Sequence, residues 1–317
     1  MKSGLKGASA TERIFAMRNR MFIIGNGFDL AHALPTRFDP DFKEFAEAYE
    51  QWDFWGRYQT EQENIWSDFE NLLAHPDINT LEEIFNGYAP NYLSDRESDR
   101  DAIIYQVELN GRLNDALTAF ANNAEQVMKE RVNKISYLEN IIDSEACYLN
   151  FNYTHTLKHV YGISAKQVLH IHGEVGMNNL ALGYPEGSFK PEPYLYDVRQ
   201  KGRGPYAEMD PKEYIEKIDD YYTRTAYTNL LDKCKSFSKE IRIDLLAEFL
   251  NERQSEIEEF IVYGHSCGID FDYFHYLICR YSKAMWKFFV RGEEQKTNVI
   301  KNIVDGFAIT KFEIIEI

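Results

Sequence analysis

The sequence predicts an α/β fold with a mostly parallel sheet of about six strands and large helical insertions. Short apolar runs recur along the chain, and several are continuously apolar, as strands are when both faces of a sheet are covered. Helical patterns separate these runs, which is the alternation that parallel β-α units produce. Two long segments, mostly helical, interrupt the alternation and indicate insertions into one domain.

Six short runs are expected to form the strands. In chain order they are Met21–Gly25, Ala146–Phe151, Val168–His172, Phe260–Gly264, Trp286–Val290 and Phe312–Ile317. A chain of 317 residues can bury about three quarters of its unfolded surface. With 21 Tyr and 21 Phe, it has the composition of a packed globular protein.

The remaining segments define the predicted domain organisation. Residues 1–20 are polar and basic and form an N-terminal extension, and residues 21–317 form a single α/β domain. Helical insertions are expected at about residues 38–145 and 176–258. The second insertion begins with a loop rich in Gly and Pro and ends in a helical pattern.

The segment ENIWSDFE belongs to the first insertion. On a helix, Glu63, Trp66 and Glu70 would lie on roughly one face, because residues three and four apart are neighbours. Trp66 is expected in the core. Glu70 either lies in solvent beside it or reaches a binding pocket as a lid carboxylate.

Composition excludes several classes of function. The net charge of −16 argues against generic binding to nucleic acid or membranes, although a local pocket for one nucleotide remains compatible with it. The four cysteines form no C-x-x-C pair, so neither a zinc site nor a disulfide framework is expected. No apolar run approaches the ~20 residues that span a bilayer. We therefore expect a cytoplasmic protein with reduced thiols.

The stretch FIIGNGFDLAHALPT carries the first functional signal. A strand, then Gly25-Asn26-Gly27, then a helix is a geometry that can cradle a phosphate, because glycine permits close approach and a helix N-terminus attracts anions. The dinucleotide fingerprint G-x-G-x-x-G fails at Leu30, so a tight turn without a ligand is the alternative. Asp29 is expected to cap the helix, or to face a ribose hydroxyl or a cation.

Three further polar clusters follow predicted strands. Ligands of open parallel sheets bind at the carboxyl ends of the strands, so these clusters are expected to converge on one cleft. Each has a structural alternative, since Asn152 can close a turn, Ser266 can cap a helix, and a buried histidine is usually a satisfied core residue. The clusters comprise Asn152, Thr154 and His155; His170, His172, Gly173 and Glu174; and Gly264, His265, Ser266, Asp270 and Asp272.

These same segments resemble a known family. GNGFDLAHALPT, ENIWSDFE, FNYTHTL, HIHG, YGHS and DFDYF are similar to the AbiH family, the abortive-infection proteins of bacterial phage defence, from about residue 21 to residue 290. That pattern in turn is similar to sirtuin-like, Rossmann-like NAD-binding proteins. Their turn G-A-G-x-S-x-x-A-G-x-P corresponds to residues 25–35, with Asp29 at the serine and Ala33 at the second-half glycine.

The sirtuin-like resemblance extends to the other strand ends. Asn152-Tyr153-Thr154 matches an N-x-D segment with Thr154 at the aspartate. His172-Gly173 matches the catalytic His-Gly pair, and Gly264-His265-Ser266 matches the Gly-Thr-Ser segment that holds the nucleotide. The four-cysteine zinc module of true sirtuins has no counterpart in the sequence, so protein deacetylation is not expected.

The resemblance implies a phage-defence effector that binds NAD, as substrate or ligand, and cleaves its N-glycosidic bond without a metal. His172 would act as general base or polarise a ribose hydroxyl, and Asn152 would orient the ribose or the water. Backbone N–H groups of the glycine turn would hold the pyrophosphate. The implied nucleotide contacts are Gly25, Asn26, Gly27, Phe28, Asp29, Thr154, Gly264, His265 and Ser266.

Two other functions stay open. A metal-dependent phosphoesterase or nuclease would use His170, His172, His265, Asp29 and Asp270 as ligands. A nucleotide-binding switch without catalysis would use the aromatic helical insertions to bind a partner. A second copy of the chain or a phage-derived trigger is the expected partner.

Overall fold

The computed structural model describes residues 19–317 except 60–63, 94–95, 97–98, 198–205 and 254–255. Its centre is a six-stranded, all-parallel sheet, which confirms the predicted α/β class and all six predicted strands. The strands are β1 (Arg20–Ile24), β2 (Cys147–Asn150), β3 (Val168–His170), β8 (Glu259–Tyr263), β9 (Met285–Val290) and β10 (Phe312–Glu316).

The strand order across the sheet is β10-β9-β8-β1-β2-β3. From β1 the chain moves outward through β2 to β3, returns to place β8 on the other side of β1, and then moves outward through β9 to β10. The loops that follow β1 and β8 therefore leave the sheet in opposite directions. This switch point opens a crevice at the carboxyl ends of the two strands, the usual position of ligands in such sheets.

Both faces of the sheet are buried, as the continuously apolar strands predicted. Met21 and Ile23 point to one face, while Phe22 and Ile24 point to the other. The first face is covered by α11 (Ile243–Asn251), α12 (Phe271–Arg280) and the π-helical segment Val299–Asp305. The second is covered by α1 (Gly27–Ala31), α7 (Ser136–Glu139) and α8 (Thr156–Tyr161).

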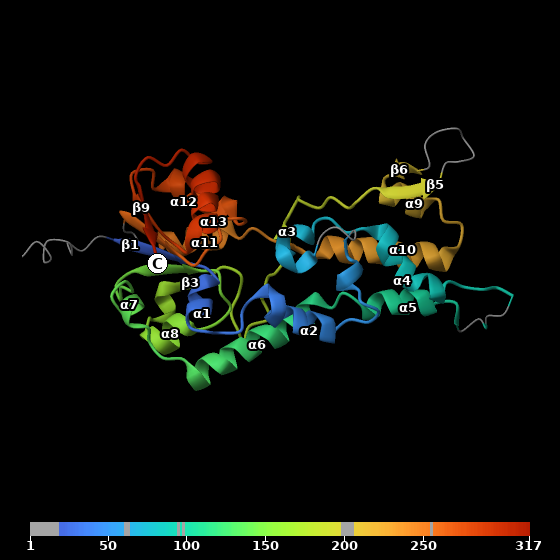
Figure 1. Ribbon diagram of the computed structural model, residues 1–317, viewed down its shortest axis with the longest axis horizontal. Coiled ribbons are helices and arrows are strands. Elements are labelled where there is room, and N and C mark those ends of the chain that lie inside the picture. Colours follow the sequence, from blue (N-terminus) through green and yellow to red (C-terminus); the bar gives the residue numbers. More distant parts are fainter. Residues whose placement is uncertain (1–18, 60–63, 94–95, 97–98, 198–205, 254–255) are drawn as a thin grey trace, which may run out of the picture.

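Most of the two insertions forms one helical body beside the sheet (Figure 1), whereas α7 and α11 at their C-terminal ends cover the sheet. The two insertions share a core, in which α5 (Ala102–Leu109) of the first insertion packs on α10 (Tyr221–Ser236) of the second. The other helices of this body are α2 (Lys43–Ala48), α3 (Phe69–Leu72), α4 (Ile78–Phe85) and α9 (Pro211–Glu216). The longest helix, α6 (Leu113–Arg131), contacts α2 in the helical body and α8 beside the sheet, and so bridges the two bodies.

The second insertion differs in detail from the prediction. It contains two small sheets, which pair β4 (Tyr184–Pro185) with β7 (Ser238–Lys239) and β5 (Tyr194–Asp197) with β6 (Tyr206–Met209). These strands are two to four residues long, so they are too short to be predicted from a pattern of apolar residues. Its last helix, α11, covers the sheet and leads directly into β8.

The segment ENIWSDFE is not the single helix that was predicted. A 3-10 turn over Ile65–Ser67 gives way to α3 at Phe69, because Asp68 between them has non-helical dihedral angles, with φ of −148° and ψ of 62°. Trp66 is buried in the core as expected. Glu63 lies outside the described residues, as do residues 1–18 of the predicted extension, and Arg20 already belongs to β1.

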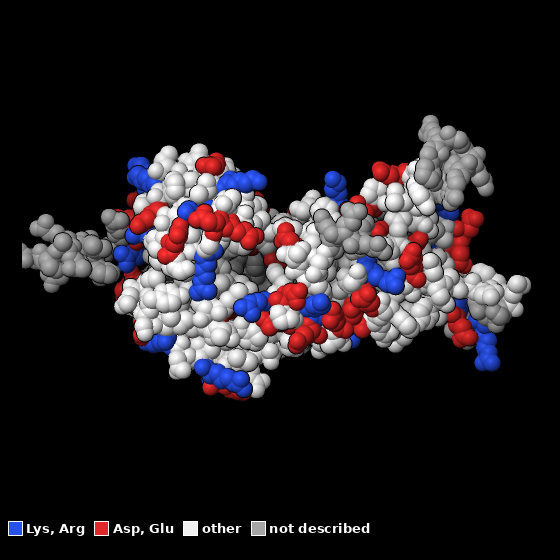
Figure 2. Space-filling model, in the orientation of Figure 1, with Lys and Arg blue, Asp and Glu red and all other residues white. Residues whose placement is uncertain are grey.

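Two expectations from composition can be compared with the structure. Among the described residues, no helix is both long enough and apolar enough to cross a bilayer. All four cysteines are free, and Cys279 alone is exposed. Acidic side chains are spread over both bodies on the face in view, with basic side chains interspersed (Figure 2).

Candidate functional site

A cavity of about 570 Å³ lies at the switch point, between the turns that follow β1 and β8. This volume is in the range of sites for small organic ligands. The sheet supplies a polar wall, and α6 supplies an apolar wall of Leu117, Phe120, Ala121 and Ala124. Of the predicted site residues, the cavity is lined by Gly25, Asn26, Gly27, Asp29, Asn152, Thr154, His172, Gly264, His265 and Ser266.

The two glycines of the first turn face the turn after β8. A Cβ on Gly25 would lie 2.5 Å from the Cα of His265, and one on Gly27 would lie 2.6 Å from the Cα of Gly264. Gly264 itself has a φ of +69°, a conformation that side chains rarely adopt. The glycines are therefore required for two neighbouring turns to pack, which is the structural alternative that the sequence left open.

The backbone N–H groups of the glycine turn are already bonded within the protein. Gly25 N–H donates to the Tyr263 carbonyl at 3.0 Å, and Gly27 N–H donates to the Gly264 carbonyl at 2.8 Å. Phe28 N–H donates to the Gly25 carbonyl at 2.9 Å. Each of these three groups therefore has a protein acceptor in this structure, and the role toward a pyrophosphate that was expected of them stays a prediction.

Phe28 differs from its predicted position, whereas Asn26 lies where it was predicted. The Phe28 ring packs against Tyr161 and Tyr263 in the core beneath the sheet and does not line the cavity. Asn26 lines the cavity with its side-chain amide engaged, since Nδ2 donates to the Thr36 carbonyl at 2.6 Å.

Asp29 neither caps its helix nor points into solvent. The hydroxyls of Thr154 and Thr156 donate to its two carboxylate oxygens at 2.6 Å and 2.9 Å. Burial raises its pKa to about 6, although the two hydroxyl hydrogen bonds oppose the shift. The predicted helix cap is thus corrected, because the turn after β2 supplies hydroxyl partners for this carboxylate.

His172 lies beside a buried charged group in the cavity wall. Its Nε2 is 3.3 Å from Oδ1 of Asp270, a contact outside hydrogen-bond geometry. Lys239 Nζ is 3.1 Å from the same Asp270 oxygen and 2.7 Å from Oε1 of Glu70. Burial would raise the pKa of Asp270, but His172 and Lys239 outweigh it and hold that pKa well below its usual range.

Lys239 was missed at the sequence level, although it is only 4% exposed. The neighbouring carboxylates keep its pKa raised in spite of burial. Its local sequence, SFSKE, looks like an ordinary polar segment of the second insertion. Only the pairing of β7 with β4 places this ammonium behind the cavity. Glu70, its partner, lines the cavity, which is the second of the two positions that the sequence allowed for it.

His265 is held in one neutral tautomer. Cys267 N–H donates to its Nδ1 at 3.0 Å, so the proton of the neutral ring is on Nε2, which lies 3.9 Å from Oδ2 of Asp270. Burial lowers the pKa of His265 to about 4. The ring of Phe151 packs edge-on against both His172 and His265 and shields this part of the wall from water.

Asn152 and Ser266 join the turns around the cavity. Asn152 Nδ2 donates to the Gly25 carbonyl at 3.1 Å, which ties the end of β2 to the end of β1. Ser266 Oγ accepts from Gly268 N–H at 3.3 Å, so it stabilises its own turn and does not cap a helix. Of the predicted cluster that follows β8, Asp272 does not contribute to the cavity, because it is exposed and does not line it.

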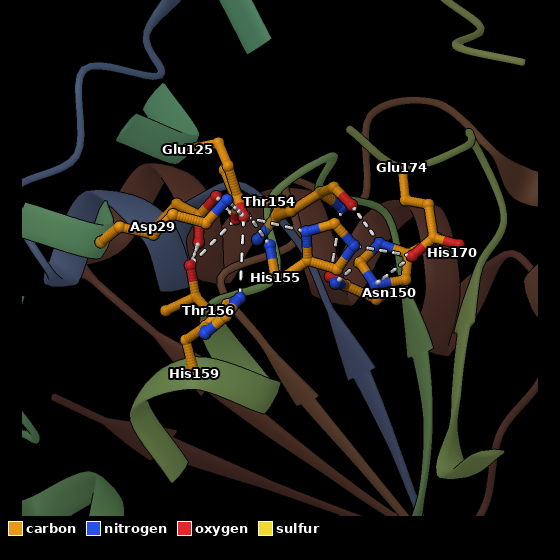
Figure 3. Close-up of polar contacts among 11 residues, drawn as sticks. Asp29, Glu125, Asn150, Thr154, His155, Thr156, His159, His170 and Glu174 are labelled. Carbon is orange, nitrogen blue, oxygen red and sulfur yellow. Dashed lines mark hydrogen bonds and ion pairs between the residues drawn. The ribbon is translucent and has the colours of Figure 1, made fainter. Parts of the chain in front are cut away.

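A second polar cluster lies outside the cavity (Figure 3). His155 is held between Glu125 of α6 and Glu174, with Nδ1 and Nε2 at 3.0 Å and 2.8 Å from their carboxylate oxygens. These contacts raise the pKa of His155 and, against the effect of burial, lower that of Glu125 to about 2. The cluster fastens α6 to the loops at the carboxyl ends of β2 and β3.

His170 and His172 are two residues apart in the sequence but belong to different sites, since His170 lies in the second cluster and His172 lines the cavity. Strand β3 ends at His170, whose Nδ1 is 2.8 Å from the Asn152 carbonyl, and His172 turns toward Asp270. The two histidines therefore do not lie on one face of the strand. Within the described part of the chain, no three His, Cys, Asp or Glu side chains form a metal-binding group. Lys239 instead places an ammonium against Asp270.

Comparison with known protein families gives a match over most of the chain. A family model described as Bacteriophage abortive infection AbiH matches residues 21–290, from the second residue of β1 to the last residue of β9. No curated protein and no solved structure matches the chain.

Proposed function

This chain belongs to the AbiH family of bacteriophage abortive infection proteins, and on that premise we propose that it binds NAD in the cavity and hydrolyses its N-glycosidic bond, as a cytoplasmic effector. One observation carries the proposal. His172 lies beside the ionised Asp270 in the wall of a ligand-sized cavity at the switch point of a parallel sheet.

The composition of the cavity fits the nicotinamide end of NAD. Glu70 and Asp270 line it beside the apolar wall of α6, so a flat ring with a positive charge is favoured there. The pyridinium of NAD is such a ring. The carboxylates also stabilise the charge as it moves from the ring to the ribose carbon in an oxocarbenium-like transition state.

Hydrolysis follows from these groups without a general acid. The bond between the ribose C1′ and the pyridinium nitrogen breaks, and its electron pair leaves with nicotinamide, which becomes neutral. A water oxygen bonds to C1′ while His172 takes one of its protons, and ADP-ribose is the other product. The proton is then released from His172 to solvent.

Asp270 and Lys239 act on this step through His172. Asp270 stays ionised because Lys239 is 3.1 Å away, so its charge is available when the imidazole becomes an imidazolium. Asn152 closes the adjoining turn on the Gly25 carbonyl and so holds the turn in place. The positions of the reacting groups thus depend on the residues that follow β1, β2 and β3.

The experiment is incubation of the purified chain with NAD, with and without EDTA, followed by chromatography of nicotinamide. We expect release that persists in EDTA. His172→Ala should abolish it, while the circular dichroism spectrum and the melting temperature stay close to those of the wild type.

His275→Ala is the matched control, because His275 is exposed and stacks on Phe307 outside the cavity. It should release nicotinamide at the wild-type rate. Full activity of a folded His172→Ala variant would refute the mechanism. Release that disappears in EDTA would favour the metal-dependent alternative, and tight binding of NAD without release would favour the switch.

A further inference from the structure

The cavity contains one cationic side chain that the proposed chemistry does not use. Arg291 follows β9 directly, and among the described residues that line the cavity it is the only Lys or Arg. The same lining includes the carboxylates of Asp29, Glu70, Asp270 and Glu294. A ligand with an anionic group is repelled from those carboxylates and attracted to Arg291 alone.

The glycine turn does not compete for that anion. Its N–H groups at Gly25, Gly27 and Phe28 donate to protein carbonyls at 2.8–3.0 Å. A phosphate placed there would have to break bonds that also hold the turns of β1 and β8 together. The donor for a phosphate must therefore come from another wall of the cavity.

The backbone of Arg291 is fixed relative to the turn after β8. Arg291 N–H donates to Oε1 of Gln295 at 2.7 Å, and Nε2 of Gln295 donates to the His265 carbonyl at 3.0 Å. Gln295 lines the cavity as well. The Gln295 side chain thus connects the position of Arg291 to the turn that contains His265 and Ser266.

The charge of Arg291 is not neutralised within the described structure. Its guanidinium donates to the hydroxyl of Tyr137 at 3.4 Å, a long contact to a neutral group, and makes no ion pair with a described carboxylate. This includes Glu294, three residues further along. A guanidinium with open donors suits a phosphate, which it can bind through two parallel hydrogen bonds.

We infer that Arg291 binds the anionic phosphates of the cavity's ligand. The ligand then has its ribose and base at His172 and Asp270 and its pyrophosphate at the end of β9, not at the glycine turn. The inference rests on the proposed function for the identity of the ligand. The position of the anion rests on Arg291 itself.

Titration of the full chain with ADP-ribose in a calorimeter tests the inference, because this probe has the pyrophosphate and lacks the scissile bond. Wild type should bind it, and Arg291→Gln should bind about tenfold or more weakly. Lys301→Gln removes an equal charge from an exposed position outside the cavity and should bind as wild type does. With NAD, Arg291→Gln should raise KM and leave kcat close to the wild-type value.

The outcomes separate this inference from the proposed function. Equal ADP-ribose affinity of wild type and Arg291→Gln overturns the inference, as does a wild type that fails to bind the probe. Binding that depends on Arg291 without any nicotinamide release supports the inference and refutes the hydrolase. Release of nicotinamide by the wild type, together with an unchanged affinity of Arg291→Gln for ADP-ribose, supports the hydrolase and refutes the inference.

Discussion

At the scale of single residues, the charge behind the cavity is the least expected feature. Lys239 and Asp270 are buried, Glu70 lies beside them largely covered, and each of the two carboxylates is within 3.1 Å of the ammonium. Burial of such charges is tolerable only while the partners remain together, since an unpaired buried charge is costly. The same contacts keep Asp270 ionised beside His172, so stability and the proposed chemistry depend on one lysine.

Replacing Lys239 with Met should lower the free energy of unfolding by about 3–5 kcal/mol, because Glu70 and Asp270 would be left buried without a cation. Chemical denaturation monitored by circular dichroism measures this loss. The control is Lys217→Met, which removes an exposed lysine paired with Glu213 at 2.7 Å. That exposed pair should contribute less than about 1 kcal/mol. Similar losses in both variants would show that Lys239 does not neutralise the two carboxylates.

At the scale of elements, the turns after β1 and β8 behave as one unit. Gly25 and Gly27 touch the backbone of Gly264 and His265, and two hydrogen bonds join the turns. A side chain at either glycine would occupy space that the neighbouring backbone already fills. The glycines therefore set how closely the two turns pack at the cavity. Their N–H groups donate to protein carbonyls.

Gly25→Ala should destabilise the protein by about 1–3 kcal/mol, because its Cβ would lie 2.5 Å from the Cα of His265. Gly87→Ala is the matched control in the helical body, where a Cβ would meet no atom within 4 Å. That variant should be neutral or slightly stabilised. Thermal unfolding of the two variants provides the comparison. A Gly25→Ala variant as stable as Gly87→Ala would show that the turns separate easily.

At the scale of the whole molecule, α6 is the bridge between the sheet and the helical body. It supplies the apolar wall of the cavity through residues 117–124, and its Glu125 is fastened to His155 next to the sheet. The insertions are therefore part of the site and not an appendage to it. Residues of both bodies line the cavity, and Figure 1 shows α6 running between them.

Saturating ADP-ribose should slow amide hydrogen exchange in residues 117–124 of α6 as well as in the turns after β1 and β8. Both regions line the cavity, and bound ligand suppresses the local opening that exchange requires. Mass spectrometry of peptides measures the change. Peptides from α9 (Pro211–Glu216), which is far from the lining residues in the helical body, serve as the internal control. Protection confined to the two turns would separate α6 from the binding site.

The sequence by itself determined the sheet. The six strands are short runs whose apolar residues must be buried on both faces, and that requirement is local to each run. The sequence also determined that the polar clusters follow the strands. Because the strands alternate with helices and are parallel, their carboxyl ends lie at one edge of the sheet. Of the predicted catalytic and nucleotide-contacting residues, all but Phe28 line one cavity. The other residues of the strand-end clusters that do not line it are His155, His170, Gly173, Glu174 and Asp272. The predicted roles of the lining residues toward NAD stay predictions.

Only the tertiary structure decided which polar groups are available to a ligand. The partners of Asp29 are Thr154 and Thr156, and that of Lys239 is Glu70, so each contact joins segments more than one hundred residues apart. In the same way, the N–H groups of Gly25 and Gly27 donate to the carbonyls of Tyr263, at the end of β8, and of Gly264, directly after it. Hydrogen bonds and ion pairs depend on distances of about 3 Å, which local patterns of apolar and polar residues do not specify. Burial is encoded along the chain, whereas the pairing of polar atoms is settled only when distant segments meet.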